Sequence, residues 1–95
     1  MSPLDRRART GPALPPERWL AILDRLLTEM IDQQHDKVLR LARRMVPGIT
    51  PEDLRNPQDF PQLSHDPVFN YEDGILTGLR SAHIALRAEL RGCES

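Results

Sequence analysis

The sequence predicts an all-α protein: an antiparallel hairpin of two long helices that pairs with a second copy into a dimeric four-helix bundle. Three observations favour this fold. Leu, Ala, Arg and acidic residues dominate the 95 residues while β-branched residues are sparse, which favours helices over strands. The nine prolines all lie at positions 3–16 or 47–67 and leave two long stretches uninterrupted. Both stretches carry apolar residues at helical spacing.

A chain of this length is one domain at most. Residues 1–14 mix proline, glycine and charge without periodicity, so we expect a flexible arm there. The hairpin domain is expected at 15–92, followed by a tail at 93–95. Within it we place a helix at 16–46, a linker at 47–66 and a second helix at 67–91.

The first helix has a clear start and a clear stop. Pro16 suits the first turn, where its missing N–H would be unpaired, and Glu17 suits the positive end of the helix dipole. Pro47 and Gly48 end the helix. Its apolar residues follow 3-4-3 spacing at Leu20, Leu23, Leu27 and Met30, widened by Trp19, Ile22, Leu26 and Ile31. A helix of this length is not stable alone in water, so this face must be covered.

The linker contains its own structural signals. Thr50, Pro51 and Asp53 form a helix-start pattern, with Thr as the N-cap and an acid at the third position. Phe60 and Leu63 are expected to pin the linker onto the end of the hairpin. Long loops are functional or disordered in many proteins, and both an ordered lid and a disordered loop remain open.

The second helix is predicted to start at Asp66-Pro67 and to stop at Gly92. Its core face reads Val68, Tyr71 or Glu72, Ile75 or Leu76, Leu79, His83, Leu86 and Leu90. Gly74 and Gly78 lie four residues apart, and Ala82 continues the same side. This small-residue row indicates close approach of another helix; alternatively, Gly74 marks a frayed end and the helix starts later.

Two helices contact each other along a single seam, yet each has an apolar arc wider than one partner can cover. Pairing two hairpins would cover the remainder. The residues expected at the interface are Trp19, Leu23, Leu27, Met30, Gly74, Gly78 and Ala82.

Two histidines suggest an alternative function. His35 and His83 are both placed on the inward rows, and Asp32 precedes His35 by three residues. If Val46 lies opposite Glu72 at the closed end, the histidines share a level, and a dimer would hold four of them. Such an arrangement resembles an iron or zinc site in a helical bundle. The competing interpretation is a buried polar layer that fixes register.

Other function classes find little support. Ser64-His65-Asp66 supplies the residue types of a catalytic triad, but residues adjacent in the chain rarely point toward one another as a triad requires. No catalytic or cofactor-binding residue is therefore assigned. The net charge of −1 argues against nucleic acid as a partner despite basic residues at Arg6–Arg9 and Arg40–Arg44.

The sequence also bears on location. There is no run of 18 apolar residues and no apolar segment behind the N-terminal arginines, so we expect neither a membrane span nor a signal peptide. Cys93, the single cysteine, cannot form an intramolecular disulfide and is taken as an incidental thiol. Twelve of the thirteen basic residues are Arg, which is typical of a GC-rich bacterial genome. The sequence therefore predicts a bacterial, cytoplasmic protein–protein interaction module without catalytic activity, whose partners are itself and a second protein.

Overall fold

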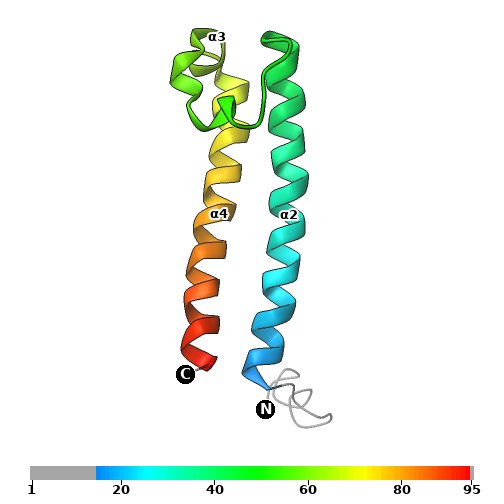
Figure 1. The fold of residues 1–95 in the computed structure, drawn as a ribbon, viewed down its shortest axis with the longest axis vertical. Coiled ribbons are helices and arrows are strands. Elements are labelled where there is room, and N and C mark those ends of the chain that lie inside the picture. The colour runs from blue at the N-terminus through cyan, green and yellow to red at the C-terminus, as the bar shows by residue number, and fades with distance from the viewer. Residues whose placement is uncertain (1–14, 95) are drawn as a thin grey trace, which may run out of the picture.

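The computed structural model describes residues 15–94, with side chains up to residue 92. Two long helices, α2 at Pro16–Met45 and α4 at Pro67–Glu94, run antiparallel and side by side along their length (Figure 1). Residues 15–94 contain helices and turns and no strand. The prediction of an all-α fold built on a two-helix hairpin is therefore confirmed. In this described range, neither long helix has an apolar stretch sufficient to cross a membrane.

Helix α2 is bounded by its prolines and by one glycine. Pro15 is the N-cap in an extended conformation (φ −60°, ψ 150°), and Pro16 occupies the first turn. At the other end, the Val46 N–H donates to the Ala42 carbonyl at 2.8 Å. Gly48 follows with φ +86°, a left-handed conformation that is costly for residues with a Cβ, so the chain turns away here.

The linker is ordered as three short helical turns: η1 at Asp53–Arg55, η2 at Pro57–Asp59 and α3 at Pro61–Ser64. A reciprocal cap holds the first of them. The Asp53 N–H donates to Thr50 Oγ1 at 3.2 Å, and the Thr50 N–H donates to Asp53 Oδ2 at 3.0 Å. The structure thus adopts the ordered alternative for this segment.

The buried core lies at the linker end of the hairpin. Its six buried apolar residues are Val38, Ala42, Ile49, Leu63, Phe69 and Leu76. Phe60 and Leu54 pack against this cluster from the linker. On α2 the buried residues are Val38 and Ala42, both in its C-terminal half. The opposite, open end of the hairpin therefore depends on partly buried contacts along a single seam.

Helix α4 begins where the Asx-Pro pattern predicts, because Asp66 Oδ2 accepts the Phe69 N–H at 3.0 Å. It passes without interruption through Gly74 and Gly78, so Gly74 does not mark a frayed start. A Cβ added at either glycine would meet no atom within 4 Å, so these positions do not serve the packing of α4 on α2. The helix continues past Gly92 to Glu94, since Gly92 keeps a helical rather than a left-handed backbone.

Candidate interaction surface

Two polar contacts fix the register of the two helices. Gln34 Nε2 donates to the Glu72 carbonyl at 2.8 Å, and His83 Nε2 lies 2.7 Å from Asp24 Oδ1. Positions 24–34 of α2 therefore lie level with positions 83–72 of α4. Since the seam uses one stripe of each helix, the hairpin keeps two uncovered sides, one apolar and one polar.

The apolar face combines large side chains from both helices. Its members are Trp19, Leu23, Leu26 and Met30 of α2 and Val68, Tyr71 and Ile75 of α4. In each row, residues three, four or seven apart share one side of the helix. The two rows lie on the same side of the hairpin. Lys37 continues the α2 row two turns after Met30, and it lines a hollow together with Leu41 of α2 and with Val68 and Tyr71 of α4.

The side chains of this face are exposed to an unusual degree for their size. Trp19 is 53% exposed and Met30 is 49% exposed, while Tyr71 reaches 69%. Of the predicted interface residues, Leu27 is half-buried in the seam, and Trp19, Leu23 and Met30 lie on the open surface. A contiguous apolar surface of this kind is typical of a protein–protein contact.

The predicted small residues border the large ones. Gly78 and Ala82 are exposed and follow Ile75 by three and seven residues, so they lie on the same side of α4. By the register above, Gly78 sits level with positions 28–29 of α2 and Ala82 with positions 24–25, so the level of Leu26 falls between them. Gly74 is also exposed, at the outer edge of this side. The apolar face thus combines rows of large side chains with a strip of small residues on α4, Gly78 and Ala82.

The polar side carries a linked cluster across the open half of the seam. Asp24 Oδ1 accepts from Arg87 Nε at 3.2 Å and is paired with His83 at 2.7 Å. Thr28 Oγ1 donates to the Asp24 carbonyl at 2.8 Å and lies 3.4 Å from His83 Nε2. The hydrogen bonds with His83 and Arg87 hold the pKa of the Asp24 carboxyl below its usual value. This cluster is the polar link between the helices at their open end.

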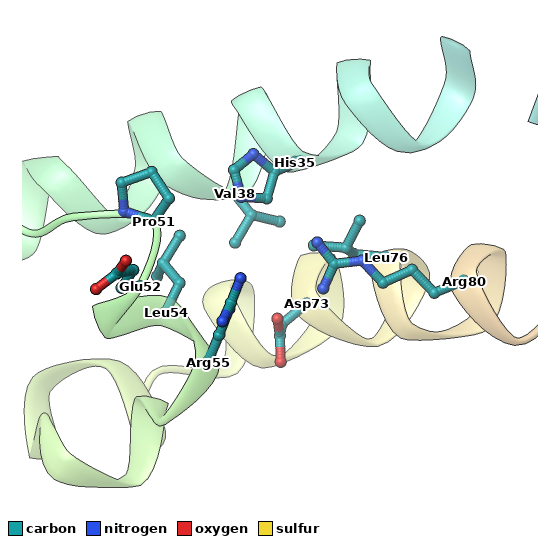
Figure 2. A pocket seen from close by; sticks show the side chains of 9 residues that line it. All are labelled: His35, Val38, Pro51, Glu52, Leu54, Arg55, Asp73, Leu76 and Arg80. Atoms are coloured by element: carbon teal, nitrogen blue, oxygen red, sulfur yellow. The ribbon is translucent and has the colours of Figure 1, made fainter. Parts of the chain in front are cut away.

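Further along the polar side, η1 and the helices enclose a groove of about 350 Å³. Figure 2 shows Arg55 of η1 and Arg80 of α4 pointing into it, with Val38, Leu76 and His35 also on its wall. Neither guanidinium has a hydrogen-bond or ion-pair partner among the described residues.

Asp73, also on the groove wall, is half-buried. Burial raises the pKa of the Asp73 carboxyl, and the charge of Arg80 opposes that rise. The groove carries charges of both signs, since Glu52 and Asp73 line it together with the two arginines. It therefore has no single charge that would select a ligand.

The residues of the predicted metal site are not brought together within one chain. His83 pairs with Asp24, eleven positions before His35 and so about 16 Å from its level along a helix. Asp32 is exposed and His35 lines the groove. Among the described residues, no group of three or more His, Cys, Asp or Glu side chains could hold a metal ion. The expectation that the two histidines share a level is wrong for the single chain.

The seam contains two charged residues, of which sequence reasoning missed Asp24 and left Glu72 as one of two alternatives. Asp24 follows Leu20 by four and precedes Leu27 by three, which is seam spacing and could have identified it. Glu72 is 6% exposed, and its Oε2 lies 2.9 Å from Lys37 Nζ in an ion pair without hydrogen-bond alignment. The sequence left Tyr71 and Glu72 as alternatives for this position, and the structure buries the glutamate.

Two predictions fall outside what the structure describes: the arm at 1–14 and the side chain of Cys93. No family model, curated protein or solved structure matched this chain.

Proposed function

We propose that this protein is a non-catalytic helical interaction module that pairs with a second copy of itself through the apolar face. The single observation that carries the proposal is the exposure of four large apolar side chains in one row on α2, Trp19, Leu23, Leu26 and Met30. Exposed single apolar residues need no explanation, whereas a contiguous row continued across a second helix indicates a contact surface.

The size of the apolar face supports pairing. If a whole side chain of this size presents about 150–250 Å², the exposed fractions of its seven residues leave on the order of 600–700 Å² per chain. Specific interfaces bury roughly 800 Å² on each partner. The face is therefore close to the size of one standard interface.

The alternative function, a metal-binding bundle, has weaker support. His83 is turned toward Asp24 on the polar side, and His35 lines the groove on that same side. A dimer formed through the apolar face would keep the histidines of the two copies on opposite outer surfaces. The interaction module is therefore the better-supported function.

Sedimentation equilibrium tests the proposal with a matched pair of variants. Met30→Glu places a charge in the middle of the apolar face. Ile84→Glu places the same charge at an exposed isoleucine on the polar side, four residues after Arg80 and three before Arg87. Burying an unpaired charge costs about 3 kcal/mol or more, so we expect Met30→Glu to weaken pairing by at least about 100-fold.

Circular dichroism on both variants shows whether the helices are retained. The expected result is a monomeric Met30→Glu protein and a dimeric Ile84→Glu protein, each with wild-type helix content. A wild-type protein that stays monomeric at tens of micromolar would contradict self-pairing and leave the face to a helix of another protein. A Met30→Glu protein that pairs as tightly as the wild type would show that the contact does not use the apolar face.

A further inference from the structure

The distribution of residues on the apolar face points to one arrangement of the pair. We infer that the two copies associate in parallel, with their linkers at the same end, so that α2 of each copy lies over α4 of the partner. This inference rests on the proposed self-association and adds its orientation and its contact pairs.

Two ways of stacking the hairpins are symmetric. A two-fold axis parallel to the helices keeps both linkers at one end and places α2 over the partner's α4 at the same level. A two-fold axis perpendicular to the helices, within the interface, puts the linkers at opposite ends and places α2 over the partner's α2. The two arrangements bring different residues together, so the charge and size of those residues decide between them.

Charge is unevenly distributed along the face. On α2 the open end is apolar from Trp19 to Met30, while the linker end carries Lys37 and Arg44. On α4 the linker end is apolar, with Val68 and Tyr71. Each copy therefore presents cations on one helix beside apolar side chains on the other.

The perpendicular axis makes poor use of this distribution. With Met30 near the middle of α2, it places Lys37 over the partner's Leu23 and brings the basic end of each α2 onto the apolar row of the other copy. Covering these cations with apolar side chains removes their solvation, because Lys37 then keeps only its ion pair with Glu72 and Arg44 has no ion-pair partner among the described residues.

The parallel axis matches the same residues. By the seam register, Lys37 then lies level with position 69 of the partner, two residues or about 3 Å along the helix from the partner's Tyr71, whose ring face attracts a cation. In the large row of α2, Leu26 lies at a level between the partner's Gly78 and the partner's Ala82, and Met30 lies at a level between the partner's Ile75 and the partner's Gly78. Large side chains that pack on a strip of small residues allow two helices to approach closely. In this arrangement, no cation of one copy faces a cation of the other.

Distance measurement between two spin labels separates the two arrangements. In a Cys93→Ser background, one variant carries a label at Gln58→Cys in η2, at the linker end. A second carries it at Arg18→Cys near the start of α2, at the open end. Both positions are exposed and lie outside the apolar face as defined. Each variant is measured alone and in an equal mixture with the other by double electron–electron resonance.

The parallel arrangement predicts a short separation for each variant alone, about 20–35 Å for a few helix spacings of 8–10 Å plus the label arms. It predicts a long separation for the mixed pair, about 45 Å or more, the length of a 30-residue helix. Long distances for each variant alone with a short distance in the mixture would overturn the orientation while leaving self-pairing intact. Absence of any dipolar signal at concentrations of tens of micromolar would overturn self-pairing itself, and the orientation with it.

Discussion

The strip at Gly78 gives a prediction in which the stability of the single chain and its pairing change in opposite directions. We expect Gly78→Leu to stabilise the hairpin and to weaken the dimer. A side chain added at this position meets no atom within 4 Å in the single chain, so the fold can accept it. In the paired state the same position lies under the α2 row of the partner.

Both effects can be estimated. Glycine inside a helix costs about 0.8–1.0 kcal/mol relative to alanine, and leucine is close to alanine, so the substitution stabilises each chain by about 0.8 kcal/mol. Inserting a large side chain into a packed contact costs about 1–3 kcal/mol, and symmetry places two such sites in each dimer. Pairing should therefore weaken by about 2–6 kcal/mol, which is at least about 30-fold in the dissociation constant.

Sedimentation equilibrium gives the dissociation constant, and urea unfolding at a concentration where the protein is monomeric gives the stability of the chain. The control is Thr77→Leu, which adds a similar side chain at an exposed position of α4 on the polar side, seven residues before Ile84. It should leave pairing unchanged. The reasoning is refuted if Gly78→Leu pairs as tightly as the wild type or more tightly, because the strip would then not be a close contact.

Three further predictions concern the fold and its titrating groups. Phe69 is fully buried, so Phe69→Ala should lower the free energy of unfolding in urea by about 3–5 kcal/mol; a loss below about 1 kcal/mol would mean that its pocket is not a packed core. Burial raises the pKa of the Asp73 carboxyl above its usual 3.8, so the folded state favours the protonated acid. The stability that this group contributes at low pH is therefore lost as the pH rises through the pKa of the folded state. Asp73→Asn should therefore raise the melting temperature at pH 7 and have little effect at pH 3; an equal shift at both pH values would contradict this cause. The pKa of Asp24 is lowered by His83 and Arg87, so its contribution is present above the usual 3.8 and is lost as the pH falls through the lower, folded value. Thermal melts should show that Asp24→Asn lowers the melting temperature at neutral pH and lowers it less in acid. An unchanged melting temperature of Asp24→Asn at pH 7 would show that the cluster does not stabilise the open end.

The ends of the helices could be predicted from the sequence because local sterics determine them. Pro16 and Pro67 are tolerated in first turns, and Asp66 caps the second helix with its side chain. Gly48 ends the first helix since the turn there needs a positive φ. Such signals depend on neighbouring residues alone, so a single sequence contains them.

The register between the helices could not be predicted in the same way. Counting from the closed end placed Val46 opposite Glu72, whereas Gln34 contacts the Glu72 backbone, a difference of twelve positions or about 18 Å along α2. The cause is the linker. Figure 1 shows α3 stacked beyond the start of α4, and Leu63 of α3 is fully buried there. This packing occupies the space beside the last turns of α2, and no local pattern specifies it.

The candidate surface was predictable in part. The width of the α2 arc indicated that Trp19 and Met30 exceed what one seam covers, and both are exposed in the single chain. On α4, the spacing predicts Val68 and either Tyr71 or Glu72 in the core, yet the structure buries Phe69 and Glu72 and leaves Val68 and Tyr71 exposed. Two apolar rows one residue apart compete in this stretch, and the contact of Phe69 with the linker core, a long-range interaction, decides between them.

Native mass spectrometry of protein purified without an affinity tag or a chelator tests the central claim most directly, because it reports the number of chains and any bound mass in one spectrum. The account predicts a species with the mass of two chains and nothing added at micromolar concentration. A single chain at every concentration would contradict self-pairing through the apolar face. A pair carrying stoichiometric iron or zinc would contradict the assignment of function and make His35 and His83 the residues to substitute first.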